Sequence, residues 1–574
     1  MRKLFHKYRR TLGDYQSILS YALLGVIGGM ASGLVVLAFE LAINQLALLW
    51  GVGHGAEGFE TLPRWQIFAL PAGGALLLGL GFSLIKPEDR ETGIVHVISR
   101  MHSHYSVLPL RNALVQFVGG ILAITTGQSG GREGPGVHLG GAVNSLLGQG
   151  LQLPNNSLRI LIACGTAGGI SAAFHTPLAG VIFAMEVIMM EYSVVGFIPV
   201  ILAAVTASAI SINLNTGLTV FSHSEVALSS LWEIPYIILL GICCGMAVAG
   251  FIKVSSLSSR LGHWPIAVRF ALAGALTGGL ALYVPEILGM GYDTLRLAIL
   301  GQIAPVALIT IAACKILATS FSCGVGMPIG IIGPNLLIGA CIGGALGYLG
   351  HATMPELASK PELYIVIGMA ASMGAVLNAP LAAILAVVEL TNTVHIAMPA
   401  LLAIVAATLT NTGGFRQRSA HQTVLKQLQR LVPDDPINQL LHRTAVTSSL
   451  EVSVVKVSVN LDPARADLLS KATPGWCLIE RDTEVLYLVR GPDLVNWLAE
   501  KNSDSDDLDL TQADIRRWTI AAIPAQATLR QALDTMHAKT VEAVWVYARE
   551  RGGTPVLQGI VTREAVEHFS LSKL

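Results

Sequence analysis

The sequence predicts an all-α polytopic membrane protein made of two repeated halves, followed by a soluble α/β domain. Its 574 residues are 52% hydrophobic and only 13% charged, a composition typical of membrane helices rather than of a soluble core. Many apolar segments are shorter than the roughly 20 residues that a spanning helix needs. Two stretches also recur further along the chain without gaps.

The N-terminal segment, residues 1–14, is basic. Lys3, Lys7, Arg9 and Arg10 precede the first apolar segment, so the positive-inside rule predicts that this segment lies in the cytoplasm. The apolar run that follows is too long for a cleavable signal peptide.

The predicted transmembrane domain, 15–425, contains apolar segments of very uneven length. Short, interrupted segments predict helices that end inside the membrane, where irregular backbone is tolerated only if protein buries it or water lines it. These breaks indicate a transport pathway. The segments are 16–50, 65–86, 112–126, 137–150, 157–172, 176–190, 194–214, 230–256, 264–284, 304–322, 331–350, 363–377, 380–390 and 394–411.

An internal repeat divides this domain into halves of about 15–215 and 230–425. Gly165–Val187 matches Gly368–Leu390 at an offset of 368 − 165 = 203, including Pro177 with Pro380 and Glu186 with Glu389. Gly131, Gly134 and Pro135 recur as Gly330, Gly333 and Pro334 at an offset of 199. Duplicated halves with broken helices are typical of transporters whose ion site lies at the repeat interface.

The stretch 130–136 reads GGREGPG and carries two charges in an apolar setting. Glycines around a proline, followed by the apolar run 137–147, predict a loop that opens into a helix. Free N–H groups and the positive dipole end make such a helix start an anion site. Glu133 could occupy this site until an anion displaces it. The alternative is a surface loop with an ion pair between Arg132 and Glu133.

The repeat favours the functional interpretation of Glu133. This residue aligns with Ile332 in the second half, and a purely structural loop would not need a charge in one copy only. The two helix starts are expected to converge on one anion. Glu186 and Glu389 are present in both halves, which suits a packing or capping role.

The C-terminal region, 426–574, is predicted to be a soluble α/β domain. Charges become frequent and apolar runs shorten to strand length. The runs 541–547 and 556–562 alternate with a helix on each side, and 476–489 resembles a weaker first copy; 501–509 is a charged linker. The seven Cys form no CxxC pair and six lie in apolar segments, so neither disulfides nor a zinc site are expected.

The motifs GREGP at 131–135 and GIIGP at 330–334, with the paired PLAG and PLAA helices at 177–180 and 380–383, resemble the CLC family of chloride channels and chloride/proton antiporters. The resemblance covers about residues 15–425 and is greatest to the bacterial ClcB branch. It implies an inverted repeat with broken, tilted helices. The C-terminal region resembles a pair of CBS motifs, as found appended to CLC proteins.

The resemblance also implies the residues that contact chloride. The GSGIP element of the family falls on 91–95, where Thr92, next to Gly93, would supply the hydroxyl for the central anion. Thr92 stands where the family has Ser and Val95 where it has Pro, and chloride is expected over other small anions. Glu133, flanked by Arg132 and Gly134, matches the external gating glutamate.

Two further chloride contacts follow from the second half. The GxFxP element falls on 330–334, where the N–H groups of Ile331 and Ile332 would bind the anion although Ile replaces Phe. The central Tyr of the family aligns with His421, so the phenol is absent.

Val187 bears on the mechanism that the resemblance implies. Antiporters of the family usually carry a second, internal proton glutamate directly after the residue that matches Glu186, whereas this chain has Val187, as the channels do. We therefore expect a passive chloride channel gated by Glu133 through pH or voltage. The alternative is a chloride/proton antiporter without the internal acid, with His421 as a candidate protonatable substitute.

Other function classes fit the sequence less well. A membrane-embedded metalloenzyme using Glu186, Glu191 and nearby His is a remote alternative, because His138 and His175 have no acid at ligand spacing. No enzyme activity, metal or cofactor is expected. A formal net charge of +0 offers nothing to nucleic acid.

The expected setting is a homodimer in the lipid of the bacterial inner membrane, with both termini cytoplasmic. Neither CBS-like copy holds the complete Thr and Asp pair that binds ribose in that family. Thr562 is followed by Ala565, and Asp493 is preceded by Arg490. A regulatory or dimer-stabilising module is therefore expected rather than a nucleotide site.

Overall fold

The computed structural model describes residues 18–52, 57–192, 194–214, 228–430, 436–481, 484–500, 508–548 and 556–572. The basic segment 1–14 and most of the linker 501–509 lie outside them. The chain divides into two compact units. The membrane unit comprises Ile18–Leu151 and Leu158–Val432, and the C-terminal unit comprises Pro433–Leu574 with the short segment Gln152–Ser157.

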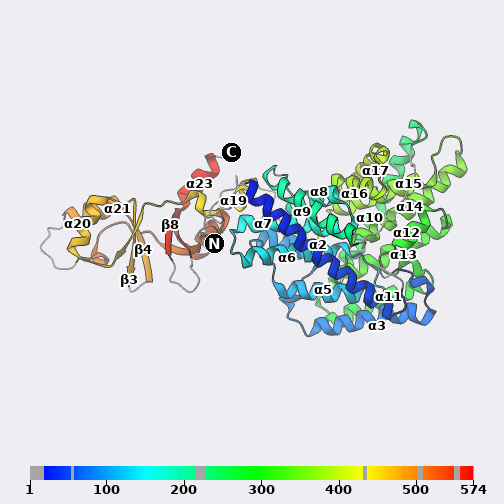
Figure 1. The fold of residues 1–574 in the computed structure, drawn as a ribbon, viewed down its shortest axis with the longest axis horizontal. Coiled ribbons are helices and arrows are strands. Elements are labelled where there is room, and N and C mark those ends of the chain that lie inside the picture. Colours follow the sequence, from blue (N-terminus) through cyan, green and yellow to red (C-terminus); the bar gives the residue numbers. More distant parts are fainter. Residues whose placement is uncertain are drawn as a thin grey trace. The chain divides into compact units, whose positions relative to one another are not determined.

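The membrane unit is all-α (Figure 1). The helices of its first half are α2 (Ile18–Leu49), α3 (Arg64–Ser83), α4 (Gly93–Ser103), α5 (Leu110–Thr125), α6 (Glu133–Gly150), α7 (Asn155–Phe174), α8 (Pro177–Phe183), the π-helical turn η3 (Ala184–Met189) and α9 (Val194–Asn213). The second half contributes α10 (Ile234–Ser258), α11 (Ile266–Ala281), α12 (Tyr292–Ile299), α13 (Pro305–Gly324), α14 (Ile332–Thr353), α15 (Pro361–Leu377), α16 (Pro380–Thr391) and α17 (Ala397–Leu409), and α18 (Ala420–Gln427) follows.

Helix lengths confirm the uneven pattern of the sequence. Within the described residues, eight helices are long and apolar enough to span a membrane, and five shorter apolar helices accompany them. The described chain is therefore a multi-pass membrane protein. The predicted segments missed α4, α12 and α18, because these short helices carry polar residues and do not stand out as apolar runs.

The repeat reappears as matched helix starts. Helices α6 and α14 begin at Glu133 and Ile332, which the 199-residue offset aligns. Helices α8 and α16 begin at Pro177 and Pro380, where the missing N–H of proline costs nothing at the first helical position.

Each half contains a close helix contact made by two glycines. A Cβ added at Gly140 of α6 would overlap the carbonyl oxygen of Gly165 in α7, and a Cβ at Gly339 of α14 would overlap that of Gly368 in α15. Small residues of this kind let membrane helices approach backbone to backbone. These contacts join α6 to α7 and α14 to α15.

The glutamates present in both halves cap helices across the repeat. Glu186 accepts from the N–H groups of Leu381 (3.4 Å) and Ala382 (2.8 Å) at the start of α16. Glu389 accepts from Leu178 and Ala179 at the start of α8, at 3.0 and 2.8 Å. This reciprocal arrangement agrees with the capping role expected from the sequence.

The C-terminal unit contains two three-stranded sheets of the same topology. In each sheet a parallel pair is followed by an antiparallel hairpin, in the orders β1-β3-β4 and β6-β7-β8. Its strands are β1 (Val454–Ser458), β2 (Asn460–Leu461), β3 (Trp476–Arg481), β4 (Glu484–Arg490), β5 (Leu508–Asp509), β6 (Ile520–Pro524), β7 (Ala543–Ala548) and β8 (Val556–Thr562). Its helices are α19 (Pro436–Arg443), α20 (Pro463–Ala472), α21 (Gly491–Glu500), α22 (Leu529–Lys539) and α23 (Arg563–Ser572). The expected α/β fold is confirmed, and each copy is a βαββα unit.

Candidate anion pathway

The two copies of the glycine-rich loop meet inside the membrane unit. Gly131 N–H donates to the carbonyl of Gly330 at 2.8 Å, and Gly330 N–H donates to the carbonyl of Gly131 at 2.7 Å. This pair of hydrogen bonds places the starts of α6 and α14 side by side. Two positive helix ends at one place favour an anion there.

The Glu133 carboxylate occupies the space between these helix starts. The residue is fully buried. A Cβ at Gly131 would overlap Glu133 Oε2, and one at Gly330 or Gly333 would lie 2.8 or 2.6 Å from a carboxylate oxygen. The Tyr292 hydroxyl, on α12, donates a hydrogen bond to Glu133 Oε1. The side chain thus sits where the sequence predicts an anion.

Arg132 turns away from Glu133. Its Nη1 lies 3.1 Å from Glu40 Oε1 on α2, and its Nη2 donates to the carbonyl of Ala173 at 2.9 Å. The loop is buried throughout. The alternative of a surface loop with an Arg132–Glu133 pair was therefore wrong, because burial draws the guanidinium to a different carboxylate.

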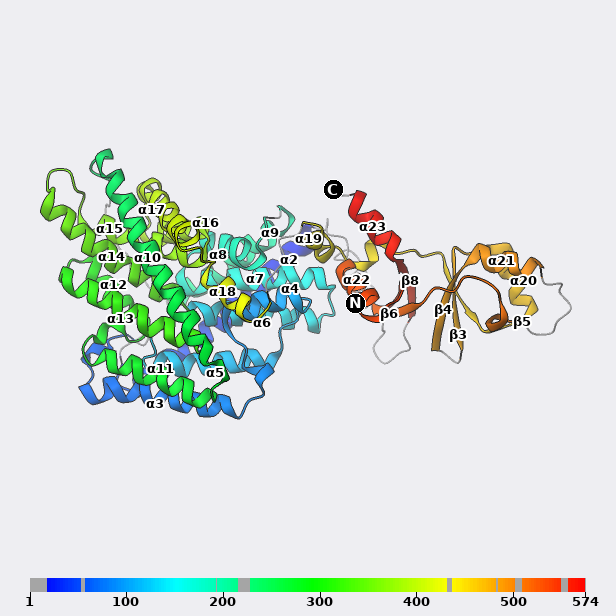
Figure 2. The same cartoon turned by 180° about the vertical axis from the view of Figure 1, so that it is seen from behind.

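A cavity of about 220 Å³ lies beside this junction. Five of the residues expected to contact chloride line it, and three do not. The lining residues are Thr92, Gly93, Gly134, Ile331 and His421; the others are Arg132, Glu133 and Ile332. Segments far apart in sequence, on α4, α6, α14 and α18, thus form one space, and Figure 2 shows α4, α6 and α18 together.

Two groups on the cavity wall differ in their availability to an anion. Gly93 has φ of +74°, a conformation that favours glycine, and its N–H donates to Gln116 Oε1 at 2.7 Å. That donor is already engaged. The Nε2 atom of His421 has no hydrogen-bond partner among the described residues, so it can face an anion.

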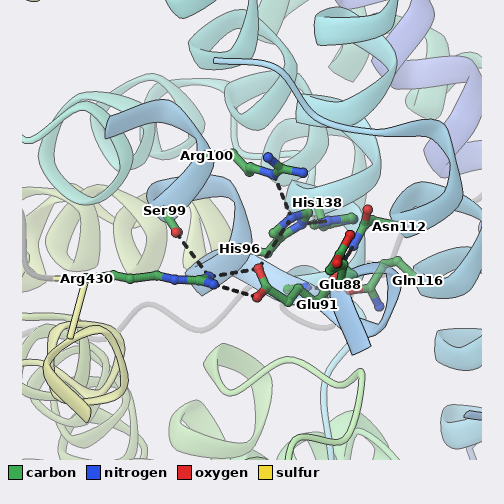
Figure 3. A network of polar contacts seen from close by, with 10 residues as sticks. Glu88, Glu91, His96, Ser99, Arg100, Asn112, Gln116, His138 and Arg430 are labelled. Atoms are coloured by element: carbon green, nitrogen blue, oxygen red, sulfur yellow. Dashed lines mark hydrogen bonds and ion pairs between the residues drawn. The ribbon is translucent and has the colours of Figure 1, made fainter. Parts of the chain in front are cut away.

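Charged side chains gather at another part of the wall (Figure 3). Arg430 donates two hydrogen bonds of 2.8 Å to the Glu91 carboxylate, and these bonds raise the pKa of the guanidinium. His96 of α4 also lines the cavity. Its Nδ1 lies 2.8 Å from Nε2 of His138 on α6.

The position of the missing internal acid is buried. Val187 is 5% exposed on η3, which packs against α4. No group of three His, Cys, Asp or Glu side chains suited to a metal gathers among the described residues. Sequence reasoning missed Tyr292 and His96 as members of this site, because no local motif marks either residue.

The described geometry is that of a membrane protein in which two repeated halves meet at paired helix starts. A sequence profile described as "Voltage gated chloride channel" matches residues 74–412. The chain therefore belongs to the CLC family, as its motifs suggested, and its function is transport rather than catalysis.

Curated relatives include both kinds of CLC protein. The chain is 30% identical over 400 residues to a "putative chloride channel protein ClcB-like" of Ralstonia nicotianae, covering 68% of this chain and 92% of the relative. It is also 30% identical over 446 residues to the "H(+)/Cl(-) exchange transporter ClcA" of Vibrio cholerae, covering 75% and 91%.

Solved structures support the fold. A "slow cyanobacterial Cl-/H+ antiporter" matches with a TM-score of 0.63 at 24% identity, covering 71% of this chain and 97% of that chain. A "eukaryotic CLC transporter" matches with a TM-score of 0.59 at 20% identity and covers 98% of both chains.

Proposed function

We propose that this protein is a chloride/proton antiporter gated by Glu133. The observation that carries the proposal is the Glu133 carboxylate lodged between two helix starts, at the place where an anion would bind. The exchange activity named for the Vibrio cholerae relative supports antiport. Antiport is therefore proposed in place of the passive channel that the sequence led us to expect.

The gate follows from electrostatics. An ionised carboxylate is attracted to the positive ends of α6 and α14 and to the Tyr292 hydroxyl, so it competes with chloride for one site. Protonation removes the charge and weakens this attraction. Chloride can then take the place of the carboxylate, held by N–H groups and helix dipoles weakly enough to leave again.

The chloride path we propose continues from Glu133 into the cavity. Thr92, Gly134, Ile331 and His421 line that cavity, and the unpartnered Nε2 of His421 supplies a donor where the family has a phenol. The backbone N–H of Ile332, at the first turn of α14, lies nearer the gate. The Gly93 N–H becomes available only if Gln116 releases it.

A passive channel remains the second candidate because of one residue. Val187 cannot carry a proton, and it stands where antiporters of the family usually have an acid. A channel would move chloride alone, with Glu133 as a gate and no proton crossing the membrane. Proton measurements separate the two functions.

The remaining features of the proposal concern the setting. We place the protein in the bacterial inner membrane as a homodimer in lipid, with cytoplasmic termini and residues 426–574 as a CBS-like regulatory domain. Arg490, at the position of the ribose-binding Thr, stacks against Trp476 and Trp518. The Thr562 hydroxyl accepts from Ala565 N–H at 3.2 Å. In neither copy is the complete Thr and Asp pair available to bind the ribose of a nucleotide.

Glu133→Gln tests the gate. The amide keeps the size of the side chain but cannot ionise, so we expect chloride flux in proteoliposomes to persist, to lose its pH dependence, and to carry no protons. Glu389→Gln is the matched control, since Glu389 is also a membrane glutamate bound to a helix start but caps α8 rather than the paired starts of α6 and α14. Unchanged pH dependence in Glu133→Gln would rule out the gating role.

A further inference from the structure

We propose that His96 and His138 form the inner proton-transfer pair of this protein. The inference rests on the proposed antiport. An antiporter needs a protonatable group that connects the cavity with the protein interior, and Val187 cannot be that group. The two imidazoles lie 2.8 Å apart, one on the cavity wall and one behind it.

The hydrogen bonds assign a proton to each ring. Arg100 Nε donates to His96 Nε2 at 3.3 Å, so this nitrogen is the acceptor of the ring and Nδ1 carries the proton. His96 Nδ1 then donates to His138 Nε2, which leaves the proton of His138 on its Nδ1. That N–H is buried and has no partner among the described residues.

An unpartnered buried donor is costly unless something accepts from it. His138 is fully buried and lies five residues after Glu133 on α6, a rise of about 7.5 Å along the helix axis. Water is the acceptor that could link its Nδ1–H with the gate. The pair can therefore exchange protons at two atoms: His96 Nε2 on the cavity side, and His138 Nδ1 inside the protein.

Other protonatable groups on the cavity wall lack this continuation. Glu91 is engaged by Arg430 through two hydrogen bonds, and its Oε2 lies 3.8 Å from His96 Nε2, beyond hydrogen-bond distance. No hydrogen bond joins His421 to a second titratable side chain among the described residues. His96 alone on this wall is bonded to another imidazole.

The transfer conserves protons. A proton from the cavity binds His96 Nε2 after Arg100 moves aside, and the Nδ1 proton of His96 crosses to His138 Nε2. His138 then releases its Nδ1 proton to water. Both rings are neutral before and after the transfer, and their reorientation restores the starting hydrogen bonds. Imidazole suits this role because one nitrogen can accept while the other releases.

Charged groups around the pair set the ease of its protonation. Helix α4 packs against α6, η3 and α18, and the fields of Arg100, Arg430 and His104 reach His96. The titratable or charged residues on these elements are His96, Arg100, His102, Glu133, His138, Glu186, His421 and Lys426. Glu91, His104 and Arg430 lie beside α4. Arg100 Nε at 3.3 Å and Glu91 Oε2 at 3.8 Å place one positive and one negative group beside His96 Nε2.

The test compares proton and chloride fluxes of the full chain in proteoliposomes under an imposed chloride gradient. His138→Gln keeps a hydrogen-bond acceptor for His96, and His96→Asn keeps a donor for His138, but neither side chain can relay a proton. We expect the ratio of proton to chloride flux to fall at least tenfold in both variants. His102→Asn is the control on α4: the Nδ1 atom of His102 lies 3.1 Å from the Ile98 carbonyl oxygen, the residue does not line the cavity, and the flux ratio of this variant should not change.

Two results would overturn the inference. A wild-type ratio in His138→Gln or in His96→Asn would show that the pair only joins α4 to α6, and antiport itself would stand. Absence of proton movement in the wild type would contradict both the pair and the proposed antiport. Because the two substitutions lie on different helices, the well-folded one decides the question if the other does not reconstitute.

Discussion

Glu133 shows what a single residue adds to a symmetric site. Its copy in the second half is Ile332, and the two loops are otherwise joined by matched hydrogen bonds between Gly131 and Gly330. Sequence alone could predict Glu133 because a charge in one copy of an apolar repeat is conspicuous. It could not predict Tyr292, which donates to the same carboxylate from 159 residues away.

The hydroxyl of Tyr292 should stabilise the closed gate. A hydrogen bond to a charged group contributes about 1.5–3 kcal/mol, so Tyr292→Phe should weaken the hold on the carboxylate at least about tenfold. We expect chloride efflux at neutral pH to rise towards the acid value, measured as ion release from proteoliposomes.

Tyr364→Phe is the matched control for this substitution. Tyr364 is also buried and also donates to a glutamate, but its partner is Glu233 and not the gating carboxylate of Glu133. Its efflux should keep the wild-type pH dependence. Equal effects of the two changes would mean that Tyr292 acts through general packing and not through the gate.

Glu60 provides a pH prediction outside the membrane helices. Burial, reinforced by the charge of Asp293, raises its pKa from 4.5 to about 7. Between these values the folded protein holds a proton that the unfolded chain has released, so this contribution to stability is full below pH 4.5 and is lost as pH rises through about 7. Glu60→Gln should flatten the dependence of Tm on pH in that window. If the Tm of this variant depended on pH as the wild-type Tm does, the raised pKa of Glu60 would be contradicted.

At the scale of elements, paired glycines hold neighbouring helices together. The approach of α6 to α7 and of α14 to α15 depends on Gly140, Gly165, Gly339 and Gly368, whose backbones touch. Sequence identified the repeat that contains these glycines but not their partners, since a contact between helices depends on how each helix is rotated.

Gly140→Ala should destabilise the membrane unit. Its Cβ would overlap the Gly165 carbonyl oxygen, and overpacking costs about 1–3 kcal/mol. We expect a lower Tm in detergent. Gly150→Ala is the control in the same helix, because a Cβ there meets nothing within 4 Å; a Tm loss as large in this variant would contradict the packing explanation.

The length and polarity of two helices explain why the functional residues on them were hard to predict. Helices α4 and α12 are short, at 11 and 8 residues, and too polar to register as apolar segments. Yet α4 carries His96 and α12 carries Tyr292. Hydrophobic periodicity finds the helices that face lipid, whereas α4 lines the cavity and α12 packs against α14 and α15, where polar groups find partners.

At the scale of the whole molecule, apolar segment lengths and an ungapped repeat were enough to predict the membrane architecture. The motifs around Glu133 and Gly330 then indicated the family. Whether chloride movement is coupled to proton movement could not be predicted from the sequence. Val187, where antiporters of the family usually have an acid, indicated a channel, while the relatives include exchange transporters. A different pair of side chains can carry protons without leaving a sequence motif, as we infer for His96 and His138.

The reversal potential of the reconstituted protein tests proton coupling most directly. With equal chloride on both sides and a pH gradient across the membrane, an antiporter must reverse at a potential displaced from zero, because proton movement contributes to the driving force. We predict such a displacement for the wild type and its loss in Glu133→Gln. A wild-type current that reverses at zero under these conditions, following chloride alone, would contradict antiport and establish the passive channel.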